Sequence, residues 1–426
     1  MYKSREYHSR YIEEEVRYAA KNSKVVLIVG ARQVGKSTLL ENLFPDYPVI
    51  TFNPLEDVKS ARKDPAFFLS QFDGPVILDE IQFAPELLAY IKIKVDQSGA
   101  MGQYFLTGSQ NLSVLKSVAE SMAGRVVIIE LTPMIIYEVA QNFSMTNSGA
   151  SPKHWLEHYL TNPQSVILQA GGTVSGMVLT EAVWRGGYPG VLGKDERWFS
   201  RYFSGYLKTY IERDVRTQTD VEQLMKFEHF VALLAALTAK EINYTELGRD
   251  IAAHGSTARR WLEIVRATYL WRDVSPFVGN TIKRVTTKTK GYFIDTGFAC
   301  QLLRITSPEH LLGHPMFGFL FETYISNMLF SVLQAVPFSV GQYHWRTNGG
   351  AEVDLVLEHG NALYPIEIKV SSVLGKHDAR GLRAFRETYA SGPQKVMPGI
   401  IVYSGADCYW VEPDVLAVPW NLLMRS

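Results

Sequence analysis

The chain has 426 residues, of which 46% are hydrophobic, enough for two or three domains with separate cores. Its 43 basic residues balance its 43 acidic residues, which excludes a polybasic nucleic-acid-binding coat and an acidic tail. The two cysteines, Cys300 and Cys408, are too few for a disulfide framework or a cysteine zinc cluster. With a charged N-terminal segment and no apolar run of bilayer length, the composition predicts a cytoplasmic protein without membrane contact.

Short apolar runs alternate with longer mixed segments from Lys24 to about Pro133. The runs are KVVLIVG, YPVITF, PVILDE, QYFLTGS and RVVIIEL. Near-continuous apolar strands separated by helical segments indicate a parallel sheet covered on both faces. We therefore predict an N-terminal helix over 1–22 and an α/β domain over 23–143.

For the rest of the chain we predict a connector, a helical domain and a second α/β domain. Residues 144–176 form a connector with one helix at 153–160, and residues 177–289 form a helical domain. Residues 290–426 form a second α/β domain, with strands in QYHWR, AEVDLVL, LYPIEIKV and GIIVYS and helices at 319–333 and 377–389.

The segment after the first strand, GARQVGKS, matches the pattern G-x-x-x-x-G-K-[ST] and opens a helix. Its glycines let backbone N–H groups surround phosphates, Lys36 supplies a positive charge, and Ser37 can ligate Mg²⁺. The predicted ligand is ATP with Mg²⁺. The residues expected to contact it are Gly30, Ala31, Arg32, Gln33, Val34, Gly35, Lys36, Ser37 and Thr38.

Two acidic residues, Asp79 and Glu80, end the apolar strand VILDE. Buried carboxylates are costly without a partner, so we expect Asp79 to hold the metal and Glu80 to polarise the attacking water. An alternative is an ordinary N-cap for the following helix.

Three other polar residues are candidates for the same site. Thr107 and Ser109 end the strand QYFLTGS, and they would sense the γ-phosphate if this strand lies between the other two. Arg125, which precedes the strand VVIIEL, is a candidate arginine finger, acting in its own site or in a neighbour's. A solvated arginine at a strand start is the alternative.

The motifs GARQVGKS, LDEIQ, LTGS and AGRV resemble the AAA-type prokaryotic ATPases that carry an uncharacterised C-terminal domain. The resemblance extends to GGYP at 186–189, YIERD at 210–214, TARRWL at 257–262 and YFIDTG at 292–297. It therefore covers nearly the whole chain. It implies an AAA-type P-loop ATPase fused to a winged-helix-like region and a nuclease-like tail, without a defined substrate.

Two helices are expected at 243–251 and 256–270, with Ser256 as the N-cap of the second. They resemble a helix-turn-helix, and the downstream residues Lys283, Arg284, Lys288 and Lys290 would form a phosphate-contacting wing. DNA binding and protein binding are both open for this part, because a basic helix face is also common in protein-binding modules.

In the tail, Asp354 lies on AEVDLVL, and Glu367 and Lys369 lie on LYPIEIKV. A two-residue turn at His359-Gly360 would oppose Asp354 to Pro365 and place all three charged groups on one face. The pattern resembles the core of the PD-(D/E)XK nuclease superfamily. This resemblance implies a Mg²⁺ or Mn²⁺ site with Asp354, Glu367 and the helix residue Glu322 as ligands and Lys369 in catalysis.

The leading hypothesis is a Mg²⁺-dependent ATPase whose nucleotide state controls a DNA-facing or partner-facing effector half, with metal-dependent nuclease activity left open. A slow nucleotide switch or scaffold without nuclease activity is the alternative. Oligomerisation is compatible with both.

Overall fold

The computed structural model describes residues 7–52, 58–109, 122–142, 152–163, 178–211, 221–278 and 288–421. The chain divides into two compact units. The first consists of Met1–Met134 with the short segments Tyr188–Gly190 and Glu263–Leu270, and the second contains the remaining residues.

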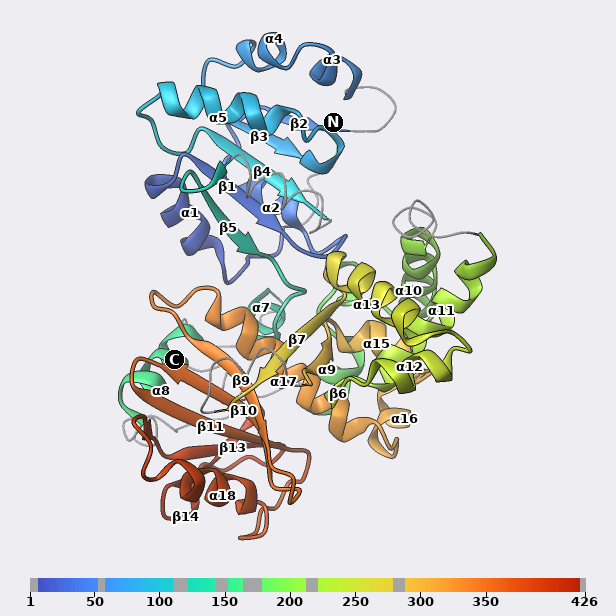
Figure 1. Ribbon diagram of the computed structural model, residues 1–426, viewed down its shortest axis with the longest axis vertical. Coiled ribbons are helices and arrows are strands. Elements are labelled where there is room, and N and C mark those ends of the chain that lie inside the picture. Colours follow the sequence, from blue (N-terminus) through green and yellow to red (C-terminus); the bar gives the residue numbers. More distant parts are fainter. Residues whose placement is uncertain are drawn as a thin grey trace. The chain divides into compact units, whose positions relative to one another are not determined.

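The first unit is built on a five-stranded sheet whose order is β2-β3-β4-β1-β5 and whose neighbours are all parallel (Figure 1). The strands are β1 (Val25–Val29), β2 (Val49–Thr51), β3 (Val76–Asp79), β4 (Tyr104–Gly108) and β5 (Val126–Glu130). Strands β1, β3 and β4 are buried along their whole length, as expected for apolar strands covered on both faces. The five predicted strands and their parallel arrangement are confirmed.

Helices pack around this sheet. They are α1 (Glu13–Asn22), α2 (Lys36–Leu43), α3 (Val58–Lys63), α4 (Pro65–Ser70) and α5 (Leu87–Gln97), with a short 3₁₀ helix η1 (Ile81–Phe83). Helix α1 is shorter than the predicted 1–22 because the residues from Tyr7 to Arg10 are not helical. It buries Val16 and Ala19, and in its acidic first turn Glu14 is exposed whereas Glu13 accepts hydrogen bonds from Tyr7, Ser9 and Arg10 N.

The second unit contains a ten-stranded sheet with the order β14-β15-β13-β11-β10-β9-β7-β8-β6, and β12 pairs with β11. The strands are β6 (Lys240–Glu241), β7 (Trp271–Pro276), β8 (Lys290–Phe293), β9 (Gly341–Arg346), β10 (Glu352–His359), β11 (Ala362–Lys369), β12 (Lys395–Val396), β13 (Gly399–Tyr403), β14 (Tyr409–Glu412) and β15 (Val415–Pro419).

A parallel pairing of β7 with β9 joins the strands β6 to β8 to the strands β9 to β15 in one sheet, with Ser275 opposite Tyr343. The sheet therefore runs across residues 289 and 290, where the sequence predicted a domain boundary. The structure places the strands β6 and β7 within residues 177–289, which the sequence predicted to be a helical domain. These strands are short and carry polar residues on partly buried positions, so their apolar pattern is weak.

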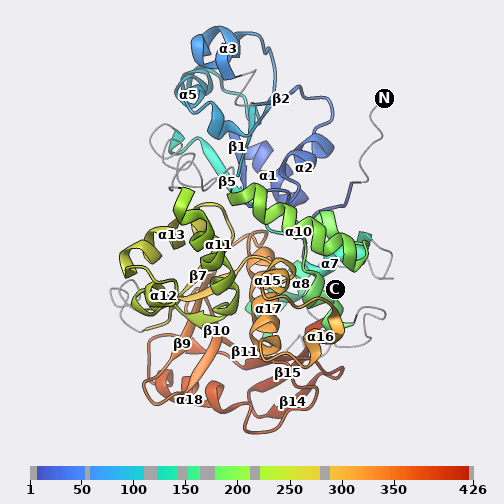
Figure 2. The ribbon, with the colours of Figure 1, turned by 90° about the vertical axis from the view of Figure 1, so that its right-hand side faces the viewer.

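The helices after Met134 are α7 (Ile136–Asn142), α8 (Pro152–Thr161), α9 (Leu179–Arg185), α10 (Glu196–Tyr210), α11 (Val221–Ala236), α12 (Tyr244–Asp250), α13 (Gly255–Ala267), α15 (Thr296–Leu302), α16 (Pro308–Leu312), α17 (Phe317–Leu333) and α18 (Arg380–Tyr389); a 3₁₀ helix spans Pro189–Val191. The last residues of α13, from Glu263, and the first two of the 3₁₀ helix belong to the first unit. Helix α17 contacts β11 and α8 (Figure 2). Helix α13 begins at Gly255, so Ser256 is not the expected N-cap; its hydroxyl lies 2.9 Å from His254 Nδ1.

The two faces of β11 are covered by different helices. Leu363 belongs to an apolar cluster with Leu382 and Phe385 of α18. The ring of Tyr364, on the other face, packs edge-on against Tyr159 of α8. Alternation along the strand therefore places its odd-numbered side chains toward α18.

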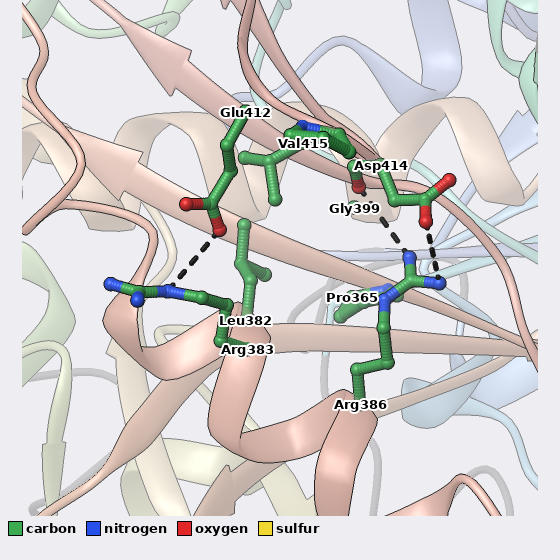
Figure 3. Close-up of a pocket in the computed structure, with 9 residues that line it drawn as sticks. Pro365, Leu382, Arg383, Arg386, Gly399, Glu412, Asp414 and Val415 are labelled. Carbon is green, nitrogen blue, oxygen red and sulfur yellow. Dashed lines mark hydrogen bonds and ion pairs between the residues drawn. The ribbon is translucent and has the colours of Figure 1, made fainter.

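A cleft of about 250 Å³ is lined by Pro365, which lies on β11 between the segment that pairs with β12 and the segment that pairs with β13 (Figure 3). Proline has no N–H, so β12 and β13 pair with β11 on either side of this position. Two arginines of α18 line the cleft, and each is already paired with a carboxylate. Arg383 lies 3.2 Å from Glu412, and Arg386 lies 3.3 Å from Asp414.

The motifs GGYP at 186–189 and YFIDTG at 292–297, which are far apart in the sequence, contact each other through the side chain of Asp295. Its carboxylate accepts hydrogen bonds from Gly187 N at 2.7 Å and from Phe298 N at 2.8 Å, which caps α15. A Cβ at Gly186 would lie 2.5 Å from this carboxylate. Because the group is fully buried, burial raises the pKa of Asp295 to about 6.

The packing of α18 on β10 predicts the effect of an alanine at Gly381. A Cβ there would lie 1.9 Å from the carbonyl oxygen of Glu352. Alanine normally favours a helix over glycine by about 1 kcal/mol, but here we expect Gly381→Ala to destabilise the fold by about 1–3 kcal/mol through the clash. Thermal unfolding measures the difference.

Gly205 of α10 is the matched control, because it is exposed and a Cβ there would have no neighbour within 4 Å. Gly205→Ala should leave the melting temperature unchanged or raise it. Equal melting temperatures for the two variants would contradict the close approach of α18 to β10.

Candidate functional site

Residues 30–37 form the turn between β1 and α2, and both of its glycines are needed for its shape. Gly30 has a φ of 143°, and a Cβ there would lie 2.2 Å from the carbonyl oxygen of Leu131. Gly35 has a φ of 99°, and Gln33 also lies in the left-handed region at 61°. The turn thus has a phosphate-loop conformation in which L-residues other than glycine would be strained at both ends.

Lys36 begins α2 and is 6% exposed. Its Nζ donates to the carbonyl oxygens of Gly30 at 3.0 Å and Ala31 at 2.8 Å. The ammonium group therefore lies inside the turn, where the phosphates of a nucleotide would meet it.

The carboxylate of Asp79, at the end of β3, accepts hydrogen bonds from the start of α2 and from β4. Ser37 Oγ and Thr107 Oγ1 each donate to Asp79 Oδ1 at 2.5 Å. This geometry depends on β4 lying between β1 and β3, which was the condition set for a sensor role of Thr107. A hydroxyl and a carboxylate are oxygen ligands of the kind Mg²⁺ prefers, so Ser37 and Asp79 fit that ion.

Glu80 has a left-handed backbone, with φ at 58°, and its side chain makes no cap of η1. Ser109 Oγ donates to Glu80 Oε2 at 3.0 Å, and Gln82 Nε2 donates to the same oxygen. Burial alone would raise the pKa of Glu80, but Lys36 and the hydrogen bonds hold it below its ordinary value. The group is therefore an ionised carboxylate, and the N-cap alternative is not supported.

Sequence reasoning missed Arg10, which lies before α1. Its Nη1 donates to Val34 O and its Nη2 donates to Thr132 O, both at 2.8 Å, and its side chain is buried. Arg10 thus holds the phosphate loop against the segment that follows β5. No local pattern indicates this, because the partners are 24 and 122 residues away. Gln82, also missed, links Glu80 to Ser109.

Arg125 lies at the start of β5, whereas the phosphate loop follows the end of the parallel strand β1. Its guanidinium makes two bonds with Asp96, at 2.5 and 3.0 Å. A five-residue strand is about 16 Å long, so the structure does not bring Arg125 to the nucleotide site of its own chain. The expectation of a finger acting within one chain is corrected by this placement.

In the tail, the hairpin turn is Gly360-Asn361 rather than His359-Gly360, and Gly360 adopts a φ of 56°. Opposed residues are therefore shifted by two, with Val356 opposite Pro365 and Leu355 opposite Ile366. The expected opposition of Asp354 to Pro365 was wrong. The turns His359-Gly360 and Gly360-Asn361 share the same glycine, so the sequence pattern alone does not distinguish their registers.

The ladder between β10 and β11 ends at Leu355, beside an irregularity in the pairing of β10 with β9. Side chains replace the missing ladder bonds. Asp354 Oδ2 accepts from Ile368 N at 2.9 Å, and Glu367 Oε2 accepts from Asp354 N at 3.2 Å. Lys369 Nζ lies 3.3 Å from Glu367 Oε1. The three predicted residues of this hairpin do come together.

Lys290 of β8 also belongs to this cluster, although the sequence predicted it to be part of a phosphate-contacting wing. Its Nζ lies 2.5 Å from Glu322 Oε1 and 3.2 Å from Asp354 Oδ1, and Tyr292 donates to Glu322 at 2.8 Å. Lys290 is therefore buried in this cluster and is not part of a solvent-exposed wing. Lys288 is exposed, and Lys283 and Arg284 lie outside the described residues.

The electrostatics of this cluster follow from burial and from Lys290. Burial and Asp354 raise the pKa of Glu322 to about 7. Burial would also raise the pKa of Asp354, but Lys290 and Lys369 hold it below its ordinary value. Within the described part of the chain, no three acidic, histidine or cysteine side chains are grouped so that they could hold a metal ion. The predicted metal shell of Glu322, Asp354 and Glu367 is therefore not formed.

A cleft of about 400 Å³ opens beside Lys290 and Glu322. Residues of β6, α12, β9 and β10 line it, among them Glu246, His344, Arg346 and Glu352. Burial and the neighbouring Lys290 lower the pKa of His344 to about 4, so its imidazole is neutral at physiological pH. The cleft thus combines charges of both signs. No helix among the described residues has the length and hydrophobicity needed to cross a bilayer.

Three family models match consecutive parts of the chain. An AAA domain matches residues 22–140, a domain of unknown function (DUF8612) matches 178–309, and another domain of unknown function (DUF4143) matches 317–423. Two uncharacterized proteins, from Mycobacterium bovis and Mycobacterium tuberculosis, are each 27% identical over 412 residues, covering 96% of this chain and 83% of theirs.

Among solved structures, the chain is similar to a Walker-type ATPase of Pyrococcus abyssi, with 14% identity, a TM-score of 0.41, and coverage of 70% of this chain and 96% of that one. It is also similar to the RuvB Holliday junction branch migration motor of Thermotoga maritima, with 13% identity, a TM-score of 0.29, and coverage of 65% and 93%. These scores are too low to carry an argument. The AAA match over residues 22–140 and the geometry of the phosphate loop support a P-loop ATPase domain, which is followed by a part of the chain that matches DUF4143.

Proposed function

We propose that this protein is a Mg²⁺-dependent ATPase whose nucleotide state controls a DNA-facing or partner-facing effector half. The observation that carries the proposal is the network around Asp79, which joins Ser37 of the phosphate loop to Thr107 of the neighbouring strand. Glu80, whose backbone N donates to the same Thr107 at 2.9 Å, extends the network to the water-orienting position.

Each group has a distinct role in this proposal. Lys36 and the N–H groups of residues 30–38 bind the phosphates, and Ser37 and Asp79 would hold Mg²⁺, which neutralises phosphate charge when bound. Glu80 orients the attacking water, since its carboxylate is ionised and held by Ser109 and Gln82. Thr107 is hydrogen-bonded to both Asp79 and the backbone N of Glu80, so it would sense a change at either residue.

The order of elements in the proposed effector half supports a winged-helix-like fold. Helix α11, strand β6, helices α12 and α13 and strands β7 and β8 follow one another, and β8 pairs with both β6 and β7 in antiparallel fashion. Arg259 and Arg260 of α13 are exposed, whereas Trp261 packs against Phe227 and Phe230 of α11. An exposed basic face on the second helix supports a nucleic-acid contact.

The tail has two candidate roles. The gathering of Asp354, Glu367, Lys369 and Glu322 supports a PD-(D/E)XK-like fold, for which metal-dependent cutting is one role. The ammonium of Lys290 between Glu322 and Asp354 favours the other role, in which the tail binds without cutting. A slow nucleotide switch that acts on a protein partner is the remaining alternative. ATP turnover measured with and without DNA distinguishes it from a DNA-facing effector, because only the latter should respond to DNA.

Glu80→Gln tests the assignment of the water-orienting base. The amide keeps the shape of the side chain but cannot act as a base, so we expect ATP binding to persist while turnover falls at least a hundredfold. Lys36→Ala should instead lose ATP binding. Single-turnover assays and nucleotide retention on the purified protein separate the two effects. Wild-type turnover in Glu80→Gln would remove this residue from the mechanism.

Arg10→Ala tests the support of the phosphate loop. Each hydrogen bond from a charged donor is worth about 1.5–3 kcal/mol, so losing the bond to Val34 O should weaken ATP binding about tenfold or more. Arg10→Lys should not restore it, because one ammonium lacks the planar fork that reaches two carbonyls. Arg17→Ala is the control, since Arg17 donates to Leu43 O outside the loop. Equal affinities in Arg10→Ala and Arg17→Ala would contradict this role.

Arg125 can act as a finger only in a neighbouring copy. Arg125→Ala should then lower turnover with little change in ATP affinity, and wild-type activity should rise more than linearly with protein concentration. Asp96→Asn is the matched control, because it breaks the same ion pair but keeps the guanidinium. If the two variants lose the same activity, the ion pair with Asp96 explains the loss and Arg125 is not a finger.

A further inference from the structure

The carboxylate cluster of the tail contains a cation that comes from the chain itself. Lys290 Nζ lies within hydrogen-bond reach of Glu322 Oε1 and Asp354 Oδ1, which belong to α17 and β10. Both carboxylates are almost wholly buried, as is Lys290. An ammonium group between two carboxylates from different elements takes the place that a shared divalent ion would need.

We propose that Lys290 is the resident cation of this cluster and excludes divalent metal from it. This inference rests on the proposed nuclease-like character of the tail, but it does not depend on ATP hydrolysis. The cluster contains three carboxylates and two ammonium groups, those of Lys290 and Lys369. With Lys290 in place, a divalent ion would lie beside a buried like charge, which is strongly unfavourable.

Other protein groups also donate hydrogen bonds to the carboxylates of the cluster. Asp354 Oδ2 accepts from Ile368 N, Glu367 Oε2 accepts from Asp354 N, and Glu322 Oε1 accepts from Tyr292. A metal ion would have to displace these donors as well as Lys290. The carboxylates are thus arranged as acceptors for protein groups.

The continuity of the sheet explains how Lys290 reaches the cluster. Lys290 opens β8, which pairs with β7, and β7 pairs in turn with β9 beside β10. Val274 of β7 lies opposite Lys290. The lysine thus comes from the winged-helix-like part of the sheet and the carboxylates from the nuclease-like part. Lys290 is the residue that determines which cation the cluster holds.

Lys290→Met tests the proposal, with MnCl₂ as the probe and no nucleotide present. Removing the ammonium while keeping the length of the side chain leaves Glu322 and Asp354 without their cation. We expect Lys290→Met to melt at a lower temperature than the wild type and to recover in Mn²⁺. Electron paramagnetic resonance of free Mn²⁺ should show one more ion bound per chain than in the wild type. Adding Asp354→Asn should abolish this extra site.

Lys290→Arg is the matched control, because it keeps the positive charge and should gain no Mn²⁺ site. Lys290→Gln, also neutral, replaces the methionine variant if that protein does not fold, and it should gain the site too. Folded neutral variants that bind no extra Mn²⁺ would overturn the proposal. So would wild-type Mn²⁺ binding, or Mn²⁺-dependent DNA cutting, that disappears in Asp354→Asn. Since no nucleotide is used in the titration, a failure of the ATPase assignment would leave its result unchanged.

Discussion

A carboxylate that leaves water must find a hydrogen-bond donor or a cation, and both candidate sites are arranged around this requirement. In the first unit, the Asp79 carboxylate at the end of β3 accepts hydrogen bonds from the hydroxyls of Ser37, at the start of α2, and Thr107, on β4. In the tail, Glu322 and Asp354 are satisfied by Lys290. We infer that the difference between a hydroxyl and an ammonium as partner determines which cation each site can bind. Hydroxyls share a carboxylate with Mg²⁺, whereas an ammonium competes with a metal ion for it.

The sheet of the second unit places a further constraint on function. Because β7 pairs with β9, the strands β6, β7 and β8 and the strands of the tail belong to one hydrogen-bonded sheet. In the first unit, Arg10 joins two parts of the chain, the phosphate loop and the residues that follow β5.

The ATPase site could be predicted closely from the sequence because its signals are local. The glycines of the phosphate loop, the acidic end of β3 and the apolar strands each lie within a few residues, and the parallel arrangement then brings their carboxyl ends together. Contacts over long separations had no such signal. The 122 residues between Arg10 and Thr132 and the 64 between Lys290 and Asp354 leave no periodic pattern. The hairpin register was wrong by two residues because two turn positions share one glycine.

The central claim is that the nucleotide state of the first unit controls the second. Hydrogen exchange measured on Glu80→Gln, with and without ATP, tests it most directly because the bound nucleotide is not consumed. The account predicts that ATP protects residues 30–38 and also changes exchange in the second unit, in α12, α13 and β8. Protection confined to residues before Met134, with unchanged exchange in the second unit, would contradict it.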